Sequence, residues 1–204
     1  MAFMSAHSIA EMTLTSPEMT GEVVHAQTGQ PIAGAIVSAK WDGGYSSIGH
    51  GGTRCVWSAA VAADDSGCFR IPGWSRKHPD LQDLGIELAA YRPGYRIVTR
   101  ATEGARPKEL LGFIPVGEIK LSPRQFRLEM QRVDGQPDPR AAYLLTFLSS
   151  TDCREGGVKD MKPLYLAVRN EIQAFPPAVR DYRESPSSYS LLEEVDNRYL
   201  GRSK

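Results

Sequence analysis

The fold is decided by residues 25 to 41, which read HAQTGQPIAGAIVSAKW. The Thr28 to Pro31 stretch interrupts an apolar run with residues that suit a tight reversal. From Ala35 to Trp41, small apolar residues then alternate with polar ones, so successive side chains fall on opposite faces of an extended chain. Alternation on both sides of a short turn predicts two strands joined by a corner.

The same pattern of short alternating runs separated by turn residues continues to Val133. Residues 64 to 67 (DDSG) and 92 to 94 (RPG) have the composition of tight turns between strands. Residues 125 to 130 (QFRLEM) alternate strictly, as a half-buried strand does. Short strands at regular spacing predict an antiparallel β-sandwich over residues 20 to 133.

Residues 42 to 53 read DGGYSSIGHGGT and contain five glycines. Ordering glycine costs more backbone entropy than ordering any other residue, so this stretch predicts a long loop and a contact surface. Tyr45, His50 and Trp74 are the candidate ligand contacts around it. Trp41 and Trp57 share the parity of apolar strand residues and are predicted to lie in the core.

The two ends of the chain differ from this pattern. Residues 1 to 19 are rich in Met, Ser and Thr without a period, which predicts a flexible lead-in. Residues 134 to 204 show helical spacing, with an N-cap expected at Asp138 followed by Pro139. We expect a helical C-terminal extension that packs on the sandwich.

Composition limits the function classes. The 204 residues include 24 Lys+Arg and 24 Asp+Glu, so a nucleic-acid partner has no support from net charge. No run of about 18 apolar residues is present, so no membrane span is expected. The N-terminal residues lack the basic and apolar regions of a secretory leader, which leaves a cytosolic protein as one alternative.

The order of three stretches, GEVVHAQTGQPIAGAIVSA, AADDSGCFRIP and ELAAYRPGYRIV, resembles the carboxypeptidase regulatory-like domain family. The resemblance covers about residues 20 to 102. It implies a transthyretin-like (prealbumin-like) β-sandwich without catalytic residues, metal or cofactor of its own. The stretch IGHGGTRCVWSAAVAADDSGCFRIPGW and a later STDC also resemble small proteobacterial proteins of the cell envelope, which implies a periplasmic or envelope location.

Three cysteines allow one disulfide and one free thiol. Cys68 stands where the resembled family more often has a polar or basic residue, which marks it as the free thiol. Cys55 and Cys153 are the predicted pair, and their bond would fasten the helical segment to the sandwich. Three reduced thiols in a cytosolic protein are the alternative.

Two enzyme classes with related sandwiches have motifs that can be compared with this chain. Hydroxyisourate hydrolases end in a Tyr-Arg-Gly-Ser motif, which residues 199 to 203 (YLGRS) repeat only in scrambled form. Intradiol dioxygenases hold iron with two Tyr and two His, and no equivalent group is evident. We therefore expect a non-catalytic binding or scaffolding module of the envelope that contacts a protein or a carbohydrate or peptidoglycan-type ligand. A hydroxyisourate-hydrolase-like enzyme and a cytosolic interaction module are the alternatives.

Overall fold

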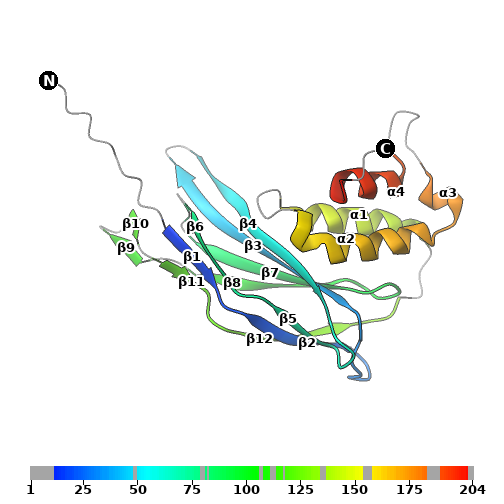
Figure 1. Ribbon diagram of the computed structural model, residues 1–204, viewed down its shortest axis with the longest axis horizontal. Coiled ribbons are helices and arrows are strands. Elements are labelled where there is room, and N and C mark those ends of the chain that lie inside the picture. The colour runs from blue at the N-terminus through cyan, green and yellow to red at the C-terminus, as the bar shows by residue number, and fades with distance from the viewer. Residues whose placement is uncertain are drawn as a thin grey trace.

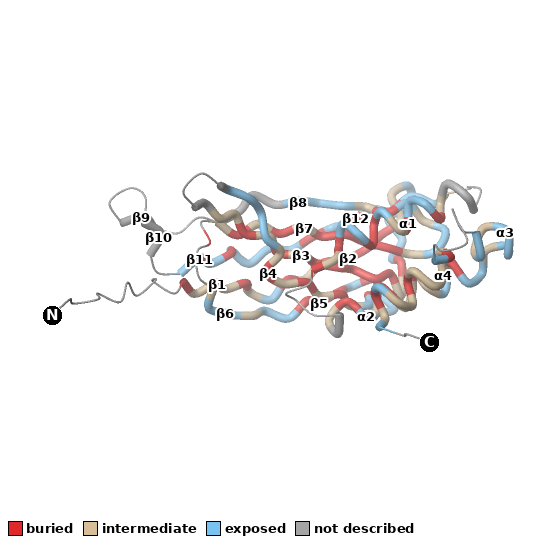
Figure 2. The backbone as a smooth tube through the Cα atoms, turned by 90° about the horizontal axis from the view of Figure 1, so that it is seen from above, coloured by how far each residue is buried: buried red, intermediate tan, exposed pale blue. Residues whose placement is uncertain are grey.

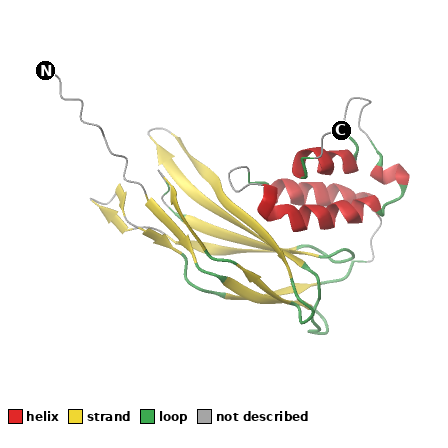
Figure 3. Ribbon diagram, in the orientation of Figure 1, coloured by secondary structure: helices red, strands yellow, loops and turns green. Residues whose placement is uncertain are grey.

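A computed structural model describes residues 12–47, 50–78, 81, 83–105, 108–110, 114–116, 118–133, 137–153, 158–182 and 189–201. Two β-layers face each other, and a group of helices covers one of them (Figures 1 and 3). The prediction of a mainly β sandwich with a helical C-terminal segment is confirmed. The finer transthyretin-like assignment stays a prediction.

The first layer is a four-stranded antiparallel sheet in the order β4-β3-β7-β8. Its strands are β3 (Ile36–Ser47), β4 (His50–Ala62), β7 (Leu84–Tyr91) and β8 (Val98–Ala105). The alternation read from residues 35 to 41 therefore lies in β3, between two hydrogen-bonded neighbours. Both faces of β3 are covered here, since Val37 and Ala39 lie in the cluster between the two layers and Ile36 lies in the cluster under the helices.

The second layer consists of two three-stranded sheets, β11-β1-β6 and β12-β2-β5. Its strands are β1 (Met12–Ser16), β2 (Met19–His25), β5 (Cys68–Ile71), β6 (Trp74–His78), β11 (Glu118–Lys120) and β12 (Gln125–Met130). The chain passes from one sheet to the other at Pro17, at Pro72-Gly73 and at Pro123, where proline removes a backbone donor. β1 pairs with β11 and β2 with β12 in parallel, so the sandwich is not purely antiparallel. A separate hairpin joins β9 (Lys108–Leu110) to β10 (Ile114–Val116).

Two predictions about flexible segments are wrong where the structure describes them. Residues 12 to 19 are not a flexible lead-in, because Met12 and Leu14 in β1 are buried in the core. Residues 42 to 47 and 50 to 53 are not a loop, because β3 and β4 pair from Ile36↔Ala62 to Ser47↔His50. Residues 1 to 11 lie outside the described chain.

Close packing explains the glycines of this hairpin. A side chain at Gly43 would meet Leu81, and one at Gly44 would meet the Asp83 carboxylate, which accepts a hydrogen bond from the Gly44 amide at 2.7 Å. Gly43 and Gly44 therefore make room for Leu81 and Asp83. The glycine content predicted a loop because glycine is common in flexible segments. Glycine is also needed where another segment packs closely against the backbone, which is its role here.

The turn predictions hold. Gly67 has a φ of 75°, and Asp64 accepts hydrogen bonds from the Ser66 and Cys68 amides, which closes the hairpin before β5. These bonds hold the pKa of Asp64 below its ordinary value, with the Ser66 side chain as the largest cause. Gly94 has a φ of 77° in the turn between β7 and β8.

The helical layer covers the outer face of the four-stranded sheet at one end of the molecule (Figures 1 and 2). It consists of α1 (Pro137–Thr151), α2 (Val158–Gln173), α3 (Pro177–Arg180), α4 (Leu191–Glu194) and the π-helical η1 (Val195–Tyr199). Since α1 begins at Pro137, the N-cap expected at Asp138 is misplaced. Leu144, Leu164 and Val168 bury their side chains in one cluster with the sheet residues Ile36 and Ala60.

Candidate functional site

The candidate site lies at the lateral edge where β6 of one layer faces β4 of the other. In β1, the residues Met12, Leu14 and Ser16 are buried in the sandwich interior. Their register partners in β6 are His78, Arg76 and Trp74. Directly opposite residues in an antiparallel pair share a face, so these three β6 side chains also point inward, at the open edge.

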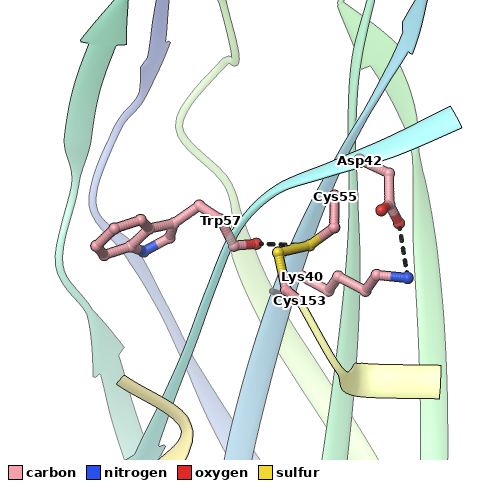
Figure 4. Close-up of a disulfide and its surroundings, with 5 residues drawn as sticks. All are labelled: Lys40, Asp42, Cys55, Trp57 and Cys153. Atoms are coloured by element: carbon pink, nitrogen blue, oxygen red, sulfur yellow. Dashed lines mark hydrogen bonds and ion pairs between the residues drawn. A yellow bond between two sulfur atoms is a disulfide. The ribbon is translucent and has the colours of Figure 1, made fainter. Parts of the chain in front are cut away.

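A β-bulge in β4 determines which side chains line the other side of this edge. Trp57 pairs with the core residue Trp41, whereas Cys55 pairs with Asp42, so Val56 is an extra residue in β4. Without the bulge, Cys55 and Trp57 would share a face. With it, Trp57 joins the interior and Cys55 turns to the helical side, and Figure 4 shows the two side chains on opposite sides of β4.

We call this edge the lateral seam and define it by the side chains that line it from β3, β4 and β6. Its ring systems contact one another: Trp74 meets Trp41 edge-on at 5.5 Å between ring centres, and Trp57 at 6.4 Å. Arginines cover two of the rings, because the Arg76 guanidinium carbon lies 3.4 Å from the centre of Trp57 and that of Arg54 lies 5.2 Å from the centre of Tyr45. The lining residues are Tyr45, Arg54, Trp57, Trp74, Arg76 and His78.

The structure places two of the three predicted contact residues, Tyr45 and Trp74, on the inner side of the seam, and their contact with a ligand stays a prediction. Tyr45 and Trp74 both pack against the sandwich core and do not form an open aromatic platform. The His50 side chain lies outside the described residues. Trp41 is fully buried as predicted, while Trp57 is half-buried and lines the seam. Sequence reasoning missed Arg76, although its alternation with Trp74 and His78 placed it on their face.

Hydrogen bonding distinguishes the two indole groups at the seam. The Trp41 N–H donates to the Ser16 hydroxyl at 3.0 Å. The Trp74 N–H is buried and has no acceptor within the described parts of the chain. A buried N–H without a partner costs about 1–3 kcal/mol. The seam therefore holds an unsatisfied donor next to its arginines.

The predicted disulfide is present. Cys55 and Cys153 are bonded across a sequence separation of 98 residues, with their Cα atoms 5.5 Å apart. The bond ties β4 to the segment after α1, beside the Lys40–Asp42 ion pair at 3.4 Å (Figure 4). Cys68 is exposed and free, as expected for the third thiol.

The opposite end of the helical pair is joined to the sheet by a buried polar group. Glu171 of α2 accepts hydrogen bonds from Arg140 of α1 at 3.0 Å and from the Tyr91 hydroxyl of β7 at 2.5 Å. The Arg140 and Glu171 side chains are only 13% and 11% exposed. Burial, followed by the negative charge of Glu171, raises the pKa of Tyr91 well above its ordinary value. Tyr91 therefore stays a neutral donor that joins three elements.

Residues 199 to 203, the scrambled hydrolase motif, are described only to Gly201. Tyr199 is 1% exposed and packs against Tyr165 at 5.1 Å between ring centres. Burial is the main cause that raises the pKa of both tyrosines. Tyr199 is thus a core residue of the helical layer, away from any open surface.

Two further searches cover only the residues that the structure describes. No cluster of three or more His, Cys, Asp or Glu side chains with the spacing of a metal site occurs among them. None of their helices combines the length and the apolar character that crossing a membrane requires.

No protein-family model matches the chain, and no curated protein matches it. Among solved structures, it is similar to 3-chlorocatechol 1,2-dioxygenase from Rhodococcus opacus 1CP, at 16% identity over 64% of each chain and a TM-score of 0.35. It is also similar to a streptococcal ancillary pilin, at 14% identity over 58% of this chain and 30% of that one with a TM-score of 0.29. A shaft pilin from Lactobacillus rhamnosus GG matches at 13% identity over 59% and 47% of the two chains with a TM-score of 0.30.

At these TM-scores the likenesses carry no argument about function. The matched region spans between 56% and 64% of the length of the first four dioxygenases.

Proposed function

We propose that this protein is a non-catalytic binding module that works outside the reducing cytosol, in the cell envelope, and that holds its ligand at the lateral seam. The observation that carries the proposal is the bulge at Val56. It places Trp57 in the seam and, two residues earlier, Cys55 in the disulfide. A structural disulfide persists in an oxidising compartment, so the strand that forms one wall of the seam is covalently fixed where the protein works.

Holding β4 in a fixed position favours binding at the seam. In the described sheet β4 is an edge strand with β3 as its one neighbour, so the ladder holds it on one side and leaves its other edge unpaired. The disulfide and the helices hold β4 from its outer side while Trp57 faces inward. A preorganised site loses less entropy when a ligand binds, so rigid aromatic and arginine side chains suit recognition.

The ligand class that we propose is a cell-wall glycan of the peptidoglycan type. The guanidinium groups of Arg76 and Arg54, which lie over the rings of Trp57 and Tyr45, offer oriented hydrogen-bond donors, which suit the many acceptor oxygens of a sugar polymer. The test is cosedimentation of the oxidised protein with purified peptidoglycan sacculi. We expect the wild type and Tyr143→Ala, which alters an exposed side chain on α1, to sediment equally. Trp57→Ala is expected to remain in the supernatant.

The same incubation tests the absence of catalysis. Sacculi kept with the protein should release no soluble fragments compared with sacculi alone. Release of fragments by the wild type would refute the non-catalytic part of the proposal. Equal sedimentation of Trp57→Ala and the wild type would place binding elsewhere.

A further inference from the structure

We propose that the lateral seam recognises a carboxylate group of its ligand through Arg76, which Trp57 holds in position. This inference rests on the proposed function, because it names the chemical group that the same seam would recognise. The argument begins with Arg76 itself.

Arg76 is exposed, yet its guanidinium group is stacked on a ring. The guanidinium carbon lies 3.4 Å from the centre of Trp57. At this distance the apolar face of the guanidinium is covered by the indole, while its N–H groups lie around the edge of the plane. Stacking therefore fixes the orientation of the donors before any ligand arrives.

The donors of Arg76 have no partner among the residues that the structure describes. Across the described part of the chain, no carboxylate forms an ion pair with Arg76 and no acceptor takes a hydrogen bond from it. Two arginines on the outer face of the second layer behave differently. Arg70 pairs with Glu18 at 2.8 Å, and Arg127 pairs with Glu129 at 3.0 Å.

The surroundings of Arg76 add positive charge. Arg54 faces the seam from β4, where its guanidinium carbon lies 5.2 Å from the centre of the Tyr45 ring. None of the six side chains that define the seam is acidic. A pre-oriented guanidinium without a carboxylate partner among the described residues is complementary to an anionic, acceptor-rich ligand.

A carboxylate fits this geometry best among common anions of glycans and peptides. It is planar and accepts two parallel N–H bonds from one guanidinium, which gives both strength and orientation. Two sources share this chemistry: a sugar acid within a glycan, and the C-terminal carboxylate of a short peptide. The probes of the test separate them.

The test measures binding of small probes to the oxidised full chain by tryptophan fluorescence and calorimetry. One arm compares trigalacturonate with its neutral methyl ester, and the other compares trialanine with its C-terminal amide. In the arm that represents the true source, the neutral probe should bind at least about tenfold more weakly, because a hydrogen-bonded charge pair is lost. Binding in that arm should also weaken as salt is raised.

Three variants identify the residue. Arg76→Gln should weaken carboxylate binding about tenfold or more, and Arg76→Lys should retain part of it, since an ammonium keeps the charge but not the planar donors. The matched control Arg70→Gln should bind as the wild type does. Both positions are exposed, so folding should be unaffected, which far-ultraviolet circular dichroism checks.

The outcomes separate this inference from the proposed function. If neither charged probe binds, or if Arg76→Gln binds like the wild type, the inference is overturned. If sacculi still sediment the protein in a Trp57-dependent manner, the proposed function survives that result. If the wild type fails to bind sacculi as well, both are lost.

Discussion

The two ends of the helical layer are fastened to the sheet in opposite ways. At the end where α1 begins and α2 finishes, Arg140, Glu171 and Tyr91 form a buried hydrogen-bonded group. At the other end, Cys55 and Cys153 form a covalent bond. Between them, an apolar cluster with Leu164 and Val168 supplies continuous packing.

The difference shows what each attachment depends on. The polar attachment depends on Tyr91 remaining a neutral donor, and so on pH in the alkaline range. The covalent attachment depends on the redox compartment, and it lies beside the seam. We infer that reduction would loosen the part of the layer nearest the proposed binding surface, while strong alkali would loosen the far end first.

Removing the disulfide should have the largest effect. In the chain-entropy model, a crosslink that closes about 100 residues stabilises the folded state by about 4.7 kcal/mol. We expect Cys55→Ala/Cys153→Ala to lose about that free energy of unfolding in urea titrations. Cys68→Ala should unfold like the wild type. A double variant as stable as the wild type would mean that the covalent attachment contributes nothing.

Breaking the polar attachment should have the second-largest effect on stability. Glu171→Ala leaves Arg140 charged and the Tyr91 hydroxyl without its carboxylate, in a place where both are buried. Loss of one partner of a buried pair costs about 3 kcal/mol. The control is Glu129→Ala, whose exposed pair with Arg127 should contribute less than about 1 kcal/mol. Similar losses for both variants in urea titrations would contradict the distinction between buried and exposed pairs.

Tyr91→Phe should lower the free energy of unfolding less than Glu171→Ala does at neutral pH. This loss should become smaller in alkali. Loss of a hydrogen bond to a charged group costs about 1.5 kcal/mol. Because the pKa of Tyr91 is raised on folding, its contribution is present below the ordinary value of 10.0 and is lost as pH rises above it. The stability deficit of Tyr91→Phe should therefore shrink above that pH. A constant deficit from pH 7 to 11 would argue against a buried neutral hydroxyl.

The smallest effect is expected within the helical layer. Arg169 of α2 binds Asp196 of η1 at 2.6 and 3.1 Å, with both side chains about one-fifth exposed. This hydrogen bonding raises the pKa of Arg169. Asp196→Asn should lower the unfolding free energy by about 1 kcal/mol and leave both attachments intact. Hydrogen exchange should show faster opening in η1 alone.

Local sequence signals predicted the parts of the fold that local chemistry controls. Alternation found the strand from Ala35 to Trp41, and turn residues located Gly67 and Gly94. Helical spacing found α1 and α2. The observed bond also confirms the predicted pairing of Cys55 with Cys153. That prediction rested partly on the family resemblance, which marked Cys68 as the free thiol.

Long-range contacts account for what the sequence did not reveal. The glycines at 43 and 44 indicated a loop, yet they serve the close approach of Leu81 and Asp83. The bulge at Val56 has no local signature, so strict alternation would have placed Cys55 and Trp57 on one face. The arginine that covers Trp57 comes from a strand about twenty residues later in the other layer.

The most direct test of the account counts free thiols in protein isolated from its native host. Alkylation without reductant, followed by peptide mass spectrometry, reports which cysteines were reduced in the cell. The account predicts that Cys68 alone is labelled and that Cys55 and Cys153 appear as one crosslinked peptide. Labelling of all three cysteines would show that the seam is not covalently fixed where the protein works, and would contradict the proposed location.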